Sequence, residues 1–327
     1  MKRRSSQNRP TSSKASRPAG ASARSRGVAL IAVLWLAILL AVIAGSLLTT
    51  TRSELRLARN LLDSARADAL ADGGIYLAIP HLLDRDAATR WPADGTVHVV
   101  ELESGRLEVA AQDAAGRIDL NTAPPELLAG LFGAAGTDPA DAAMLAARIA
   151  DWRDRDEDTL PDGAEQADYD AAGLAVRVGN GPFLNPGEIV RIPGIDMALY
   201  AQIEGAVTVW SRQRGVDPAA ATRLALLALP GMSGSAADSL IAARTEATPD
   251  PRGTDLLPFI PAEAQRWLTR GGGRVVYLTA QAQTPEGGIF RREAVIELRP
   301  GADPPYVTHA WRPALAVRPS DGDEGGT

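Results

Sequence analysis

The stretch VALIAVLWLAILLAVIAGSLL, residues 28–48, decides the fold of this chain. Its 21 residues carry no charge. An α-helix of that length measures about 30 Å, which is enough to cross the hydrocarbon core of a bilayer. A secretory signal peptide has a shorter apolar region of roughly 7–15 residues. We therefore expect a membrane anchor here rather than an ordinary signal sequence.

Charge is distributed very unevenly on the two sides of this apolar stretch. Residues 1–26 hold eight basic residues and no acid, and the remainder has 26 basic against 40 acidic residues, a net charge of −14. Because positive residues stay on the cytoplasmic side, we expect a single-pass inner-membrane protein with a cytoplasmic N-terminus and a periplasmic head. An acidic head does not suit binding to a phosphate backbone, so we expect no nucleic-acid partner.

An apolar stripe continues beyond the anchor and extends the expected helix. Its members recur at spacings of three and four, as on one face of an α-helix: Leu55, Ala58, Leu62, Ala65 and Ala69. We predict one helix over 28–79, ended by Pro80. The stripe, called the helix stripe below, is predicted to bind partner helices while the head covers one side of it.

The rest of the chain predicts an α+β fold. Two β-rich hairpins, 96–111 and 274–299, flank a long region with helical punctuation and little strand signal. We expect a small antiparallel sheet packed on the N-terminal helix, with a large all-α domain inserted in the sheet. The expected divisions are a cationic leader (1–27), the helix (28–79), the first part of the sheet (80–112), the inserted domain (113–273), the second part of the sheet (274–299) and a flexible, Pro-rich tail (300–327).

Acidic residues are densest within the expected insert. Residues 151–170, DWRDRDEDTLPDGAEQADYD, hold nine acids and two arginines. A solvated acidic loop would explain many such runs. So many carboxylates would nevertheless repel one another unless a cation neutralised them.

The spacing of these acids resembles that of an EF-hand loop, in which oxygen ligands occupy positions 1, 3, 5, 9 and 12. The candidate metal ligands are Asp154, Asp156, Asp158, Asp162 and Glu165, with Asp168 as a possible extension. Thr159 stands where an EF-hand has glycine, and Pro161 follows two positions later. We therefore predict a Ca²⁺ loop of another geometry.

Catalytic patterns are scarce in this sequence. There is no cysteine, and only three histidines are present, far apart along the chain. The GMSGS stretch at 231–235 lacks the final glycine of a nucleophile elbow. We therefore predict that the chain is not an enzyme.

One alternative is a membrane-anchored DNA-binding or DNA-uptake protein. The segment LPGMS, 229–233, followed by a helical run resembles a helix-hairpin-helix, which presents backbone N–H groups to phosphate. The insert contains no lysine and is acidic overall. Hairpins used only for packing therefore fit the sequence better.

The N-terminal features together resemble the type IV pilin and pseudopilin class. In that class a prepilin peptidase cuts after a leader glycine, and an apolar helix anchors the mature subunit. The resemblance implies processing between Gly27 and Val28, followed by N-methylation. Most members carry glutamate at the fifth mature position, where this chain has Ala32. Such a glutamate neutralises the amino terminus of the subunit ahead, so its absence points to a tip subunit.

Three later motifs make the resemblance more specific. In order, DLNTAPPELLAGL (119–131), DWRDRDEDTLPDGAEQADY (151–169) and GPFLNPGEIVRIPGI (181–195) are similar to minor pseudopilin K of type II secretion systems. That resemblance implies bound calcium in the inserted domain. It also implies a complex with minor pseudopilins I and J that caps or initiates the pseudopilus tip and supports export of folded proteins. The prepilin peptidase, the inner-membrane secretion platform and the lipid bilayer are the other implied partners.

Overall fold

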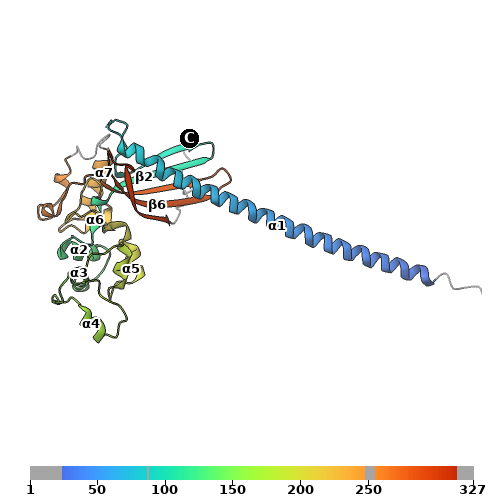
Figure 1. Ribbon diagram of the computed structural model, residues 1–327, viewed down its shortest axis with the longest axis horizontal. Coiled ribbons are helices and arrows are strands. Elements are labelled where there is room, and N and C mark those ends of the chain that lie inside the picture. Colours follow the sequence, from blue (N-terminus) through green and yellow to red (C-terminus); the bar gives the residue numbers. More distant parts are fainter. Residues whose placement is uncertain (1–23, 87, 247–254, 315–327) are drawn as a thin grey trace, which may run out of the picture. The chain divides into compact units, whose positions relative to one another are not determined.

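The computed structural model describes residues 24–86, 88–246 and 255–314 of the chain, and Figure 1 labels its elements. The chain forms two compact units, residues 1–61 and 62–327, which divide within the first helix. The α-helices are α1 (Arg24–Leu83), α2 (Pro125–Ala134), α3 (Pro139–Arg153), α4 (Gln166–Ala171), α5 (Met197–Ile203), α6 (Arg223–Leu227) and α7 (Gly234–Glu246). Short 3-10 turns cover Ala114–Gly116, Pro186–Arg191, Glu204–Ala206, Leu257–Phe259 and Ala262–Trp267.

Helix α1 is continuous and longer than the sequence indicated. It runs to Leu83, so the expectation that Pro80 ends it is wrong. Proline in the last turn removes only one helical hydrogen bond, and its fixed φ suits the helix. Gly74 serves a close contact, because a Cβ at this position would lie 2.9 Å from the Cβ of Ala280 on the sheet.

A five-stranded antiparallel sheet forms the first part of the head, in the order β1-β2-β5-β6-β7. Its strands are β1 (Asp94–Leu102), β2 (Gly105–Asp113), β5 (Val275–Gln283), β6 (Ile289–Leu298) and β7 (Tyr306–Ala314). One face of the sheet packs on α1 through buried Ala71, Ile75 and Ala78, which contact residues such as Val109 and Leu278. The α+β class and the antiparallel sheet packed on the N-terminal helix are confirmed.

Strand β7 corrects the expected tail. Residues 300–327 were predicted to be flexible because they contain five prolines, yet Tyr306–Ala314 pairs with β6 along its whole length. The β-rich sequence of this segment, YVTHAW, outweighs Pro313 because an edge strand tolerates a missing backbone N–H. Residues 315–327 lie outside the described residues.

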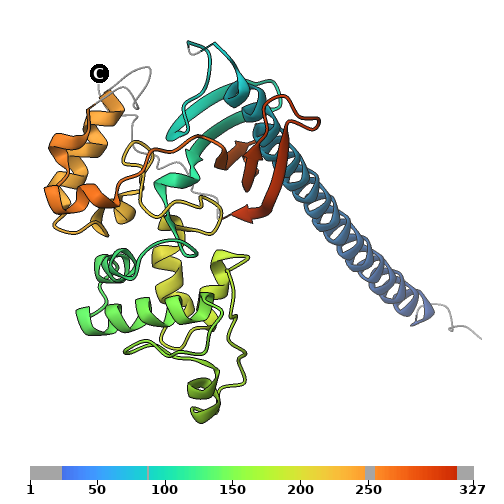
Figure 2. The same ribbon diagram turned by 60° about the vertical axis from the view of Figure 1, so that its left-hand side comes forward.

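The chain between β2 and β5 builds a separate hydrophobic core. Helices α2 and α3 lie against each other through Leu128, Leu131, Phe132, Leu145 and Ile149, all buried. Two short parallel strands, β3 (Ile118–Asp119) and β4 (Val207–Thr208), close this region near the sheet. Figure 2 shows helices α2 to α7 gathered outside the sheet. An inserted helical region is therefore present between β2 and β5, but the expectation of an all-α insert is wrong, because the short strands β3 and β4 also lie within it.

Candidate functional site

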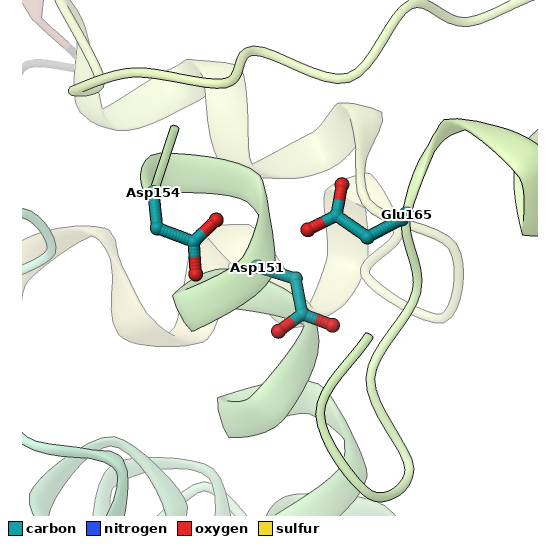
Figure 3. A group of neighbouring side chains, drawn as sticks. All are labelled: Asp151, Asp154 and Glu165. Atoms are coloured by element: carbon teal, nitrogen blue, oxygen red, sulfur yellow. The ribbon is translucent and has the colours of Figure 1, made fainter. Parts of the chain in front are cut away.

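The C-terminal end of α3 and the start of α4 bring three carboxylates together. Asp151 lies in the last turn of α3, and Asp154 caps that helix with its backbone N–H bonded to Ala150. Residues three apart share one helix face, so both carboxylates project to the same side. Glu165 approaches from the segment before α4. Figure 3 shows the carboxyl groups of Asp154 and Glu165 turned toward each other, with the Asp151 carboxyl group beside them.

The cluster, defined as Asp151, Asp154 and Glu165, has the spacing of a metal centre. One oxygen from each residue lies within 4.8 Å of the others. Asp151 and Glu165 are buried, and Asp154 is partly buried. Such burial separates this cluster from the exposed acids around it.

Hydrogen bonding leaves most of the cluster's oxygens free to bind a cation. Asp151 accepts hydrogen bonds from the backbone N–H groups of Leu160 (3.2 Å) and Ala164 (2.8 Å), which tie the intervening loop to α3. Both carboxylate oxygens of Glu165 and Oδ1 of Asp154 are buried without a hydrogen-bond partner among the described residues. Buried oxygens of this kind call for a partner, and an all-oxygen donor set is the kind that Ca²⁺ prefers.

The same burial shifts the acidity of all three groups. It raises the pKa of Glu165 from 4.5 to about 7, with further contributions from the negative charges of Asp151 and Asp154. Burial also raises the pKa of Asp154, as do nearby Asp156 and Asp151. The pKa of Asp151 rises for the same first reason, although its two backbone hydrogen bonds offset part of the effect. A cation would favour the ionised forms of all three groups.

The stability of the cation-free protein should fall as pH rises from about 5 to about 7.5. In this window the unfolded chain has already released the Glu165 proton, whereas the folded chain still retains it. Folding therefore becomes less favourable as pH rises, and the effect levels off above the folded-state pKa. Thermal melts in a chelating buffer would show this trend for the natural chain and a weaker one for Glu165→Gln. Equal pH slopes for the two proteins would contradict the prediction.

The predicted ligand set is only partly assembled. Asp154 and Glu165 belong to the cluster, whereas the other four predicted ligands are exposed and lie outside it: Asp156, Asp158, Asp162 and Asp168. Asp158 donates its backbone N–H to the side chain of Asp156 (3.1 Å), and Asp168 accepts from the backbone N–H of Glu165 (2.9 Å). Asp162 sits in a turn with φ 65°. The alternating acids Asp156 and Asp158 therefore belong to the exposed loop. The three-residue spacing of Asp151 and Asp154 at the end of α3 brings the cluster together.

The predicted ligand set does not include Asp151, the third member of the cluster. Asp151 lies in a helix, three residues before the alternating acids that begin at Asp154. An acidic residue within a helix is ordinarily expected to face solvent. The available signal was its three-residue offset from Asp154, which places both carboxylates on one helix face.

Gly163 is needed for the loop to close on Asp151. A Cβ at this position would lie 1.9 Å from Oδ2 of Asp151. Gly163→Ala should displace the carboxylate, weaken its two backbone hydrogen bonds and lower the free energy of unfolding by about 2–3 kcal/mol. Gly205→Ala is the matched control, because nothing lies within 4 Å of that position. Urea unfolding of both variants measures the difference, and similar losses would contradict this assignment.

Within the second unit, the helix-stripe residues Leu62, Ala65 and Ala69 lie on a different face of α1 from its buried residues. Leu55, Ala58, Leu62, Ala65 and Ala69 are all exposed. The buried face instead runs through Ala67, Ala71, Ile75 and Ala78. The head therefore leaves Leu62 and Ala65 exposed, and it borders the stripe only at Ala69, which lines a pocket with Glu103 and Pro285 of the head. The stripe remains available to a partner.

The membrane-anchor region is described only in part. The segment Ala29–Ser46 is helical, has a mean hydropathy of 2.7 and is long enough to cross a membrane. Ala32 lies within it and is exposed. Gly27 and Val28 lie in α1, but their side chains are outside the described part of the structure, as are residues 1–23 of the expected leader.

Comparisons with known proteins identify relatives of this chain. Residues 105–212 match the family model described as type II secretion system (T2SS), protein K. Type II secretion system protein K of Klebsiella pneumoniae is 28% identical over 202 residues, covering 55% of this chain and 61% of that protein. The chain therefore spans about three fifths of that relative's length. The resemblance seen in the sequence motifs is confirmed.

A solved structure shares the fold. The crystal structure of the GspK-GspI-GspJ complex from the type 2 secretion system of enterotoxigenic Escherichia coli matches with a TM-score of 0.53 and 16% identity. The match covers 81% of this chain and 99% of that chain. These comparisons do not support the DNA-binding alternative built on the segment around α6 and α7.

Proposed function

We infer that this chain belongs to the type II secretion protein K family and acts as a minor pseudopilin at the tip of a type II secretion pseudopilus. The observation that carries this inference is the architecture behind the family match. Residues 105–212 start in strand β2 and enter the helical insert, and this unit follows an apolar helix of membrane-spanning length. The role is structural, and the chain would support the export of folded proteins by completing the tip assembly.

Its proposed partners are minor pseudopilins I and J. The related crystal structure is a complex of GspK, GspI and GspJ. In this chain the exposed helix stripe offers an apolar, small-residue face to neighbouring helices, and such faces allow close helix packing. We place the I and J contacts on this face. The prepilin peptidase, the secretion platform and the bilayer are further proposed partners.

Ala32 is consistent with a position at the tip. A subunit inside an apolar filament needs an acid to neutralise the amino terminus of the subunit ahead of it, since an unpaired charge there is unfavourable. A terminal subunit has no such neighbour. We propose that cleavage between Gly27 and Val28 and N-methylation precede assembly, with the leader in the cytoplasm and the head in the periplasm.

We further propose that the cluster binds Ca²⁺. Its support is the set of buried carboxylate oxygens without hydrogen-bond partners, all of them hard ligands. Asp151, Asp154 and Glu165 would hold the ion, and waters would complete the six to eight oxygens that calcium takes. The ion would neutralise the cluster and fix the 155–164 loop against α3, giving the insert a rigid end.

Co-purification from detergent-solubilised membranes tests the tip assignment. A tagged full-length chain, expressed with its minor pseudopilins I and J, should retain both in equal amounts. Leu62→Glu combined with Ala69→Glu places charges on the stripe and should abolish retention. Leu184→Glu is the control, because Leu184 is an exposed leucine of the insert that does not belong to the helix stripe. Failure of the natural chain to retain either partner would overturn the proposal.

A further inference from the structure

The sheet has two edge strands, β1 and β7, and they differ in how their edges are protected. Exposed edges are templates for pairing with another chain, and proteins block them with proline, charge or bulges. Strand β7 carries Pro313, and its pairing with β6 shifts register at Val295/Ile296. Strand β1 has one register shift near its start and then pairs regularly from Val97 to Leu102. That regular part has one charged residue, Glu101, and no proline or lysine.

The hairpin register determines which backbone groups of β1 face outward. Leu102 pairs with Gly105 across a two-residue turn, and the N–H of Asp113 donates to the carbonyl of Ala93 at 2.8 Å. Odd-numbered β2 residues therefore direct their backbone groups to β1. In an antiparallel ladder the alternate residues of β1 must point theirs away. These residues are Val97, Val99 and Glu101, and no other described segment hydrogen-bonds to their backbone.

The side chains beside this edge are apolar and accessible. Val97 and Val99 pair with Ala110 and Glu108, so they lie on the face of the sheet opposite α1. Their exposed fractions are 56% and 49%. An added strand would bury both valines while it satisfied the open backbone groups.

The charge around the edge specifies the occupant. Glu101, Glu103 and Glu108 lie along the hairpin. Arg106 lies 3.7 Å from Glu101 and 3.2 Å from Glu108, and Arg66 lines a pocket beside Glu103 but pairs with Glu286. A second copy would bring the same acidic row to the contact. Residues 315–327 of this chain carry three acids and one arginine, so they are also mismatched. The basic residues 1–26 precede the apolar segment, across the membrane from the head under the proposed function.

We propose that the free edge of β1 is a docking site for an extended, cationic β-strand from another polypeptide, which adds to the sheet beside Val97, Val99 and Glu101. Backbone hydrogen bonds would supply affinity, the two valines would contact apolar side chains, and the glutamates would select for lysine or arginine. This inference depends only on the sheet, so it can fail while the tip assignment stands.

Fluorescence anisotropy with the full-length chain in detergent tests the site. The probe is a labelled ten-residue peptide of alternating valine and lysine. We expect saturable binding, with slower hydrogen exchange at residues 97, 99 and 101. A peptide with glutamate in place of lysine, and one methylated on alternate backbone nitrogens, should each bind at least about tenfold more weakly. Equal binding of all three peptides would overturn the proposal.

Variants of the edge complete the test. Val99→Pro removes an outward N–H without removing a bond to β2, and should weaken binding about tenfold, whereas Val99→Thr keeps the N–H and should bind as the natural chain does. If Val99→Pro melts abnormally, Glu101→Lys combined with Glu108→Lys provides the second test, with preference shifting to the glutamate peptide. An unchanged preference would overturn the proposal. So would a dimer of the natural chain that Val99→Pro dissociates, because it would show that a second copy occupies the edge.

Discussion

Calcium should raise the melting temperature of the full-length chain by roughly 5–10 °C over its value in chelator. A ligand present at 100 times its Kd adds about 2.7 kcal/mol of stability, and each kcal/mol corresponds to roughly 2–4 °C for a domain of this size. The expected gain rests on relieving repulsion among the clustered carboxylates of Asp151, Asp154 and Glu165, of which Asp151 and Glu165 are buried. Differential scanning calorimetry in detergent, with and without calcium, measures it.

The variant Glu165→Gln separates the cation effect from ordinary stabilisation. It removes a buried charge, so in chelator it should melt at or above the temperature of the natural chain, and it should lose most of the calcium response. Glu126→Gln is the control, because Glu126 is exposed at the start of α2 and far along the chain from the cluster. A natural chain that melts identically in calcium and chelator would contradict the calcium site. So would a Glu165→Gln variant that keeps the full response.

Arg292→Met should lower the free energy of unfolding by about 2–3 kcal/mol. Arg292 projects from β6 toward α1, is only 9% exposed and pairs with both Asp68 and Asp72, which lie one helical turn apart. Its guanidinium also lies 4.9 Å from the centre of the Phe290 ring. Loss of one partner from a buried ion pair typically destabilises by about 3–5 kcal/mol. We expect a smaller loss for Arg292→Met because the side chains of Asp68 and Asp72 are still partly exposed to water.

The neighbouring Arg291 provides a matched control for the ion pairs that Arg292 makes with Asp68 and Asp72. Arg291→Met changes the same residue type on the same strand but on the opposite face of the sheet. Arg291 forms no ion pair within the described residues. We therefore expect the free energy of unfolding to change by less than about 0.5 kcal/mol. Urea unfolding of the two variants gives the comparison. Equal destabilisation by Arg292→Met and Arg291→Met would show that the Arg292 ion pairs do not hold α1 on the sheet.

The fold was largely predictable because its signals are local. The apolar run at 28–48 and the hairpin turns at Glu103–Gly105 and Thr284–Gly288 are each encoded within a few residues, so helix and strands could be assigned. The face of α1 that the head covers could not be predicted from the sequence. Ala65 and Ala67 are equally small, and only contact with the sheet distinguishes the exposed residue from the buried one.

The candidate site was likewise predictable only in part from the sequence. Spacing along the chain identified the acidic loop and two of the three clustered carboxylates, Asp154 and Glu165. It could not identify Asp151, because the selection depends on where α3 ends and how the loop folds back at Gly163. It also could not exclude Asp156 and Asp158, which alternate as ligands would but point into solvent. Burial, rather than sequence density, separates the cluster from its neighbours.

Intact-mass and N-terminal peptide mass spectrometry on the chain extracted from native membranes tests the central claim most directly. Under the proposed function, prepilin peptidase processes the chain before it enters the pseudopilus. The account predicts a mature chain that begins at Val28 and carries one N-terminal methyl group. A chain that retains residues 1–27 in secretion-competent cells would contradict it and would leave a plain membrane-anchored protein.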